Sequence, residues 1–300
     1  MQTIRHYSQL LKFRLSITVV ISALAGYLIG VQDFEIQEFI FLIIGGFLVT
    51  GSANGFNQIL EKDYDILMER TACRPLPNNK IPYVNAIFFS LIIGVVGLYF
   101  LSMIKPHGSF YGFLSKSSAF GLLSLLIYVL SYTPLKRMST ASIFIGAIPG
   151  AIPVLLGWIA ATDDFGLAVG ILFAVQFLWQ FPHFIAISWI RDEEYKKAGF
   201  KMMYGGKKGK HPALIAFLGA IGMTIISVLP YFLNLNNLHL TTLSFILLLF
   251  LGAWFSKKSY DLLEFLNNDY AKKLMISSLL YLPLMQLIYV LDKWVIGRVF

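Results

Sequence analysis

Residues 57–77 read NQILEKDYDILMERTACRPLP, and they close a long apolar run with regularly spaced polar side chains. Asn57, Glu61 and Asp65 are four residues apart, so on a helix they share one face and follow each other by about 6 Å. An amide and two carboxylates in this arrangement offer oxygen ligands to Mg²⁺, which proteins commonly share with substrate phosphates. The stretch therefore predicts a Mg²⁺–diphosphate site where a membrane helix meets water, with an ordinary solvated helix end as the alternative.

The composition indicates an integral membrane protein. Of the 300 residues, 57% are hydrophobic and 13% are charged, which is typical of chains that cross a bilayer. Apolar runs long enough to span a membrane, about 17–25 residues, lie near 16–32, 37–60, 82–103, 111–131, 140–160, 165–189, 212–233, 239–256 and 273–291. We expect an all-α fold: one membrane domain over residues 1–300, with about nine transmembrane helices around a central cavity. Pro149 and Pro153 predict a bend in the fifth span.

The basic residues predict the orientation of these spans. Of the 24 Lys and Arg, three precede the first span, four follow the second, two the fourth, seven the sixth and four the eighth. By the positive-inside rule the N-terminus and these loops are cytoplasmic, and the C-terminus is outside. The net charge of +8 then reflects topology and contact with anionic lipid in the bilayer. Since no soluble nucleic-acid-binding module is evident, we expect no nucleic acid as a partner.

The N-terminus and the cysteine content narrow the setting. Residues 1–17, MQTIRHYSQLLKFRLSI, contain no small-residue cleavage site and continue into a full span. We interpret them as the start of an uncleaved first helix in a bacterial plasma membrane, because mitochondrial import segments are normally longer and rich in Arg and Ser. Cys73 is the single cysteine, which excludes internal disulfides and multi-cysteine metal sites.

Two groups of cations follow the second and fourth spans. Arg70 and Arg74 come within one or two turns of the carboxylates, and guanidinium groups bind phosphate oxygens in pairs. In SYTPLKRMS (131–139), Tyr132 stands four residues before Lys136, whose ammonium group would neutralise a leaving diphosphate. A basic membrane flank without any such function is the alternative for both groups.

The sixth span ends in WQFPHF (179–184) and continues as WIRDEEYKKAGFKMM (189–203). Gln180 and His183 fall inside the bilayer, where polar side chains are functional by default, although a lone histidine in an apolar helix is often structural. Asp192, Glu193 and Glu194 form a second acidic group on the same side as the first. The two groups together predict a binuclear metal site, and surface carboxylates are the alternative for each group alone.

These motifs together resemble the UbiA-type intramembrane prenyltransferases and, within them, the family of protoheme IX farnesyltransferases, or haem O synthases. The resemblance rests on nine spans, the two acidic motifs, and the stretches 68–76, 132–137, 146–158 and 179–184. It covers residues from about Lys12 to Met203, and the last three spans add only hydropathy.

The resemblance implies a reaction and its substrates. The family transfers a farnesyl group from farnesyl diphosphate to the 2-vinyl group of haem B, with addition of water, and gives haem O and diphosphate. Mg²⁺ is the implied cofactor, while haem B is a substrate. A haem A synthase or a terminal oxidase assembly is an implied partner.

The resemblance also assigns roles to residues. It makes Asn57, Glu61 and Asp65 the first metal–diphosphate motif and residues 192–194 the second, with Arg70, Arg74, Tyr132 and Lys136 beside the diphosphate. His183 and Gln180 would lie near the porphyrin, His183 as an axial iron ligand or as a base towards water. Either arginine would equally pair with haem propionates.

The sequence departs from the family pattern in three places. Glu61 stands where the superfamily more often has Asp. The second motif usually carries two aspartates four residues apart, whereas Asp192 has Ser188 and Lys196 at that distance, so the metal ligands among residues 192–194 stay open. Residues 139–142 read STAS where the family commonly has an Asn.

Two other functions remain as alternatives. A sister polyprenyltransferase acting on an aromatic quinone precursor would share the first acidic motif, and only the runs at 70–76 and 179–184 favour haem. A polytopic transporter would carry its charges at mid-membrane on broken helices, whereas these acids gather at one face of the membrane.

Overall fold

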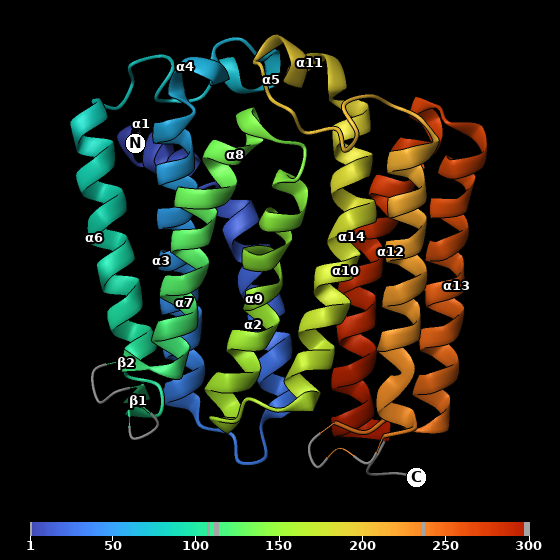
Figure 1. Ribbon diagram of the computed structural model, residues 1–300. Coiled ribbons are helices and arrows are strands. Elements are labelled where there is room, and N and C mark those ends of the chain that lie inside the picture. Colours follow the sequence, from blue (N-terminus) through green and yellow to red (C-terminus); the bar gives the residue numbers. More distant parts are fainter. Residues whose placement is uncertain (1, 107–108, 111–113, 234, 236–237, 297–300) are drawn as a thin grey trace.

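The fold is a bundle of long helices standing side by side (Figure 1). The computed structural model describes residues 2–106, 109–110, 114–233, 235 and 238–296. Eight helical segments in this part of the chain are long and apolar enough to cross a membrane. They are α2 (Phe13–Gly30), α3 (Ile36–Leu60), α6 (Tyr83–Ser102), the continuous α7–η2–α8 (Lys116–Leu126, Ile127–Tyr132, Thr133–Met138), α9 (Ser142–Thr162), α10 (Leu167–Ile190), α12 (Lys210–Val228) with η3 (Leu229–Tyr231), and α14 (Asn268–Leu291) with η4 (Asp292–Ile296).

A ninth long helix, α13 (Thr242–Phe265), packs against α12 and α14. Its first half is apolar, and its last turns carry Lys257, Lys258, Asp261 and Glu264. The expectation of an all-helical membrane fold with about nine spans is confirmed. The two strands of the described chain, β1 (Ser109–Phe110) and β2 (Leu114–Ser115), form only a short antiparallel pair.

The short helices gather at one end of the bundle. Figure 1 places α1 (Gln2–Leu10), α4 (Lys62–Asp65), α5 (Glu69–Ala72) and α11 (Asp192–Lys197) together at the top, near the outer end of α8. Both predicted acidic motifs and the N-terminal helix therefore lie at the same end, as the charge distribution predicts.

Helix α9 is the centre of the fold, and it stays helical across Pro149 and Pro153. Each proline removes a backbone hydrogen bond inside the helix. Pro153 leaves the Pro149 carbonyl without its helical donor, and Ser124 Oγ of α7 donates to that carbonyl at 3.4 Å. Gln176 Nε2 of α10 donates to the neighbouring Gly150 carbonyl at 2.8 Å. Such substitutions by side chains are how membrane helices tolerate proline.

Small residues bring α2 and α9 into backbone contact. A Cβ on Gly157 would lie 1.7 Å from the Ala23 carbonyl oxygen, and one on Gly26 would lie 2.1 Å from that of Val154. Close approach of this kind increases van der Waals packing between membrane helices, where lipid removes the hydrophobic driving force.

The predicted end of the fourth span at residue 131 is wrong. Helical structure continues through a π-helical turn, η2, into α8, so Tyr132 and Lys136 lie on the helix and not in a loop. Pro134 does not stop it because it stands in the first turn of α8, where a missing N–H is tolerated. Residues 111–113, part of the predicted start of this span, lie outside the described residues.

Candidate functional site

A polar cavity of about 410 Å³ lies at the end of the bundle that carries α4 and α5. It is enclosed by residues of α2, α3, α4, α5, η2, α8, α10, α11 and α14, and by connecting residues that include Arg74. The structure brings eight of the predicted site residues to its wall: Asn57, Glu61, Asp65, Arg70, Arg74, Tyr132, Lys136 and His183. We call it the polar cavity below.

The first acidic motif keeps its four-residue spacing across a helix break. Helix α3 ends at Leu60, and Glu61 links it to the short α4. The backbone N–H of Glu61 still bonds to Asn57 O at 3.0 Å, and that of Asp65 to Glu61 O at 2.8 Å. Because these bonds retain helical geometry, all three side chains face the same cavity.

Each member of this motif has a cationic partner. Lys12 Nζ donates to Asn57 Oδ1 at 3.0 Å, and Lys136 Nζ donates to Glu61 Oε1 at 2.7 Å. Arg74 Nη1 donates to both oxygens of Asp65, at 2.9 and 2.7 Å. Three cations from three separate parts of the chain thus meet three oxygen-bearing side chains on one wall.

Burial shifts the pKa values of two groups on this wall, Asp65 and Lys12. Asp65 is fully buried, and desolvation raises the pKa of its carboxyl group, against the opposing effect of Arg74. Desolvation, with Arg74 and Lys136 nearby, lowers the pKa of Lys12 to about 7.

Lys12 is the functional candidate that sequence reasoning missed, since it was counted only as a topology signal. It adopts a left-handed conformation, with φ 48°, at the break between α1 and α2. Non-glycine residues rarely adopt this region. A basic residue just before a first span is too common for the sequence to have singled it out.

Tyr132 and Lys136 form a pair, as their spacing on a helix allows. The Lys136 ammonium lies 4.5 Å from the centre of the Tyr132 ring, a cation–π contact. The Tyr132 ring packs directly on Gly146, where a Cβ would lie 2.5 Å from it. Tyr132 ends the π-helical turn, a feature frequent at functional sites.

His183 lies on the wall formed by α10 and α14, and its tautomer follows from its contacts. Ser278 Oγ donates its single proton to the Met275 carbonyl at 2.6 Å, so His183 Nδ1, 2.8 Å from the same oxygen, must be the donor to it. Nε2 then carries a lone pair, and it has no hydrogen-bond partner among the described residues. The Trp179 ring stacks on the imidazole at 4.7 Å, and its indole N–H donates to Ser278 O at 2.9 Å, which fixes the ring orientation.

Gln180 does not line the polar cavity. Its side chain is buried, and Nε2 donates to the Ala147 carbonyl at 2.8 Å and to that of Gln176 at 3.3 Å. The structure therefore gives this amide a role in joining α10 to α9, and its predicted contact with a porphyrin stays a prediction.

The second acidic group also lies off the cavity wall. Asp192 is paired with Lys196 at 2.7 Å and Glu194 with Arg191 at 2.8 Å, while Glu193 is exposed. Ser188, Arg191 and Tyr195 of the same segment do line the cavity. Among the described residues, no group of three or more His, Cys, Asp or Glu side chains is placed to hold a metal ion.

The donor set of the first motif fits Mg²⁺ shared with a phosphate ligand. Two carboxylates and one amide supply oxygen atoms, the ligands that Mg²⁺ prefers, and Mg²⁺ usually takes its other ligands from water and phosphate. Lys12, Arg74 and Lys136 contact these oxygens, and Arg70 lines the same cavity, so all four can balance phosphate charge.

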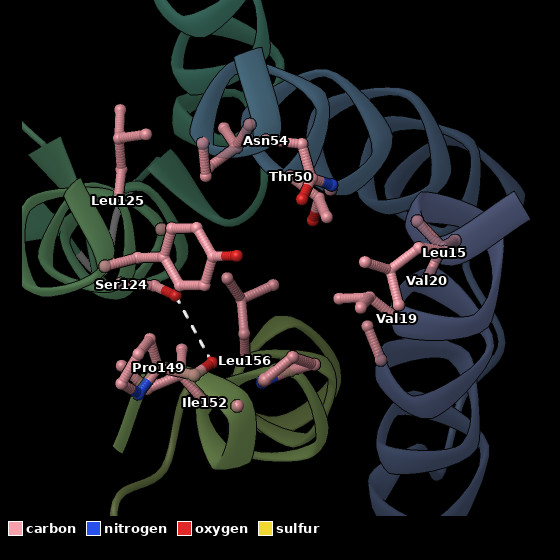
Figure 2. Close-up of a pocket in the computed structure, with 18 of the residues that line it drawn as sticks. Leu15, Val19, Val20, Thr50, Asn54, Ser124, Leu125, Pro149, Ile152 and Leu156 are labelled. Atoms are coloured by element: carbon pink, nitrogen blue, oxygen red, sulfur yellow. Dashed lines mark hydrogen bonds between the residues drawn. The ribbon is translucent and has the colours of Figure 1, made fainter. Parts of the chain in front are cut away.

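A second, apolar cavity of about 230 Å³ adjoins the polar one. The two share Leu15, Tyr128, Tyr132 and Phe184 in their walls. Figure 2 shows this chamber ringed by Leu15, Val19 and Val20 of α2, Thr50 and Asn54 of α3, Ser124 and Leu125 of α7, and Pro149, Ile152 and Leu156 of α9. We call it the apolar chamber.

Comparison with known proteins agrees with this arrangement. The UbiA prenyltransferase family matches residues 19–279. A protoheme IX farnesyltransferase of Flavobacterium psychrophilum is 42% identical over 291 residues, which are 96% of this chain and 94% of that protein. One of Cytophaga hutchinsonii is 40% identical over 289 residues, 96% of this chain and 97% of that protein.

Solved structures share the fold. A digeranylgeranylglyceryl phosphate synthase superposes with a TM-score of 0.80 at 23% identity, over 98% of this chain and 99% of that one. A UbiA homologue from Archaeoglobus fulgidus bound to GPP and Mg²⁺ superposes with a TM-score of 0.67 at 14% identity, over 95% and 99%.

Proposed function

The chain belongs to the UbiA prenyltransferase family, and on this premise we propose that it transfers the farnesyl group of farnesyl diphosphate to the 2-vinyl group of haem B. Water adds in the same reaction, and the products are haem O and diphosphate. The observation that carries the proposal is that a wall of carboxylates and cations opens directly into an apolar chamber inside a membrane bundle.

The two cavities suit the two halves of farnesyl diphosphate. The diphosphate would bind at Lys12, Arg70, Arg74 and Lys136, where guanidinium and ammonium groups surround the first motif. The farnesyl tail would extend past Leu15 and Tyr128 into the apolar chamber. The protein would thus hold the polar and apolar ends of one substrate in adjoining compartments.

The cation pairs of the first motif support binding of a charged substrate. Glu61 would hold Mg²⁺ together with Asn57 and Asp65. Because Lys136 and Arg74 would then lose their carboxylate partners, their side chains would turn towards the diphosphate oxygens. Bound Mg²⁺ would stabilise the charge that develops on the leaving diphosphate. Lys136 and Arg74 would add donors that face the same oxygens before the reaction starts.

The reaction begins with loss of diphosphate from an allylic carbon. The bond between farnesyl C1 and the diphosphate oxygen breaks, and the electron pair stays on the oxygen. The terminal vinyl carbon of haem B forms the new bond to C1, and water adds at the neighbouring carbon and releases a proton. Tyr128 and Tyr132 border both cavities, so their ring faces can stabilise the allylic cation.

His183 would face the porphyrin from the wall of the polar cavity that α10 and α14 form. Its Nε2 lone pair serves either of two roles, as an axial ligand of the haem iron or as a base towards the attacking water. Both roles require the tautomer that Ser278 imposes.

Of the second acidic group, Asp192 is the strongest candidate for a further Mg²⁺ ligand, because it is buried and its neighbour in sequence, Arg191, lines the cavity. We further propose that the polar end faces the cytoplasm of a bacterial plasma membrane, since most Lys and Arg lie there. A haem A synthase or a terminal oxidase assembly would receive the product.

The test is a reconstitution with purified protein. Incubation in detergent with haem B, farnesyl diphosphate and Mg²⁺ should yield a heavier, more apolar haem by chromatography and mass, and EDTA should abolish it. Absence of that product, with prenylation of an aromatic acid under the same conditions, would support the sister activity instead.

A further inference from the structure

Five of the six helices that line the apolar chamber reach its far end, and the sixth, α10, contributes Gln180 beside Gly150 and Phe184 beside the polar cavity. From the polar cavity the chamber passes Leu15 and Val19 on α2, and Gly146 and Pro149 on α9. Ten residues separate Gly146 from Leu156, which is roughly 15 Å along α9. The deepest lining residues of the five helices are Ala23 (α2), Gly46 (α3), Leu101 (α6), Gly121 (α7) and Leu156 (α9).

Only two of these five end residues are bulky. Leu101 is completely buried and Leu156 is 6% exposed. Gly121 lies against both: a Cβ there would be 2.6 Å from Leu101 Cδ1 and 3.8 Å from Leu156 Cδ1. The two leucines therefore close the far end of the chamber. The three small residues at the same end, Ala23, Gly46 and Gly121, do not fill the space between the helices.

Solid core lies one helical turn further on. Tyr27 and Ala160 follow the end residues of α2 and α9 by four positions, and Leu42 precedes that of α3 by four, because α3 runs in the opposite direction. All three are completely buried and join Leu101 and Leu156 in one hydrophobic cluster. None of the three lines the chamber. The chamber consequently has a floor, and it can be lengthened only by shortening the side chain of Leu101 or Leu156.

We propose that Leu101 and Leu156 limit the prenyl chain to three isoprene units and so determine the chain length of the donor. This inference rests on the proposed function, because it takes the apolar chamber as the site of the prenyl tail. The depth of the chamber matches an extended farnesyl chain, and a fourth isoprene unit would meet the two side chains at the floor.

The test compares binding of geranyl, farnesyl and geranylgeranyl diphosphate to the purified full-length protein with Mg²⁺, by calorimetry in detergent. Leu101→Ala and Leu156→Ala should each raise the affinity for geranylgeranyl relative to farnesyl diphosphate by about tenfold or more, the discrimination that a few apolar carbons provide. Leu42→Ala is the matched control, since it removes the same atoms from the same cluster without touching the chamber. Its ratio should equal that of the parent chain.

A second pair of variants tests the opposite direction. A Cβ on Gly46 would meet only Val20 Cγ2, at 3.7 Å, so Gly46→Ala fits and places a methyl group at the floor. It should lower the affinity for farnesyl relative to geranyl diphosphate. Gly170→Ala, whose Cβ would meet nothing within 4 Å, controls for the change in helix propensity.

Three outcomes are decisive. Unchanged ratios in both leucine variants, with normal binding of farnesyl diphosphate, would overturn the floor and leave the proposed function intact. An equal rise in Leu42→Ala would overturn it too, because general loosening would then be the cause. A parent chain that binds no prenyl diphosphate would overturn both proposals.

Discussion

Lys136 Nζ lies 2.7 Å from Glu61 Oε1, and their side chains are only 11% and 8% exposed. The two residues are 75 positions apart, on α8 and at the end of α3, so this ion pair joins the two sides of the polar cavity. A buried ion pair contributes little net stability, but loss of one partner leaves an uncompensated charge. The pair is therefore better explained by binding of a charged substrate, with Lys136 available for a phosphate group and Glu61 for Mg²⁺, than by a contribution to stability.

Lys136→Met should reduce both folding stability and turnover. The unpaired Glu61 should cost about 3–5 kcal/mol of stability, and loss of a donor to the leaving diphosphate should lower kcat by about 10²–10³. Thermal unfolding and the haem farnesylation assay measure the two effects. The double variant Lys136→Met, Glu61→Gln should recover stability but not turnover, and recovery of both would limit Lys136 to a structural role.

Asp65→Ala should abolish turnover while the protein stays in the membrane. The substitution removes a proposed Mg²⁺ ligand and frees Arg74 from its partner. Asp63→Ala is the control, because Asp63 is exposed on the same short helix and does not line the cavity. Membrane fractionation and the assay with farnesyl diphosphate check both variants, and equal turnover in the two would remove the metal role from Asp65.

His183→Ala should change the absorption spectrum of bound haem B if His183 ligates the iron. If it acts only as a base, the spectrum should stay the same and turnover should fall by about 10²–10⁴. Ser278→Ala should cause a smaller change of the same kind, since it releases the tautomer. His211→Ala is the control, as His211 packs on Tyr204 and does not line the polar cavity. A normal spectrum with normal turnover in His183→Ala would exclude both roles.

Asp192→Asn should weaken turnover at limiting Mg²⁺ more than Glu193→Gln does. Asp192 is 6% exposed, whereas Glu193 faces solvent. A Mg²⁺ titration of activity in the two variants measures the difference. Identical titrations would assign residues 192–194 to the helix surface, where Asp192–Lys196 and Arg191–Glu194 already form pairs.

Gly157→Ala should destabilise the bundle strongly. Its Cβ would overlap the Ala23 carbonyl at 1.7 Å, so α2 and α9 must separate, and overpacking of this kind costs about 1–3 kcal/mol or more. Thermal unfolding in detergent should show a lower Tm than Gly170→Ala, a substitution with open space around it. An equal Tm in the two variants would mean that α2 and α9 can separate at little cost in stability.

The sequence by itself determined the membrane fold, about nine helices and the first acidic motif. Hydropathy and four-residue spacing are local properties, so Asn57, Glu61 and Asp65 could be placed on one face without knowledge of the other helices. The distribution of Lys and Arg, also a local property, predicted that the N-terminal helix and both acidic motifs lie at the same end of the bundle.

Only the tertiary structure decided which side chains meet. Lys12 comes from the break between α1 and α2, Lys136 from α8 and His183 from α10, and nothing in their local sequence indicates that they border one cavity. Gln180, Asp192 and Glu194 were candidates of the same rank in the sequence, yet their side chains contact other partners, and Glu193 is exposed. The apolar chamber and its floor of Leu101 and Leu156 arise where six helices leave space between them. That space depends on how side chains interdigitate and not on the periodicity of any one helix.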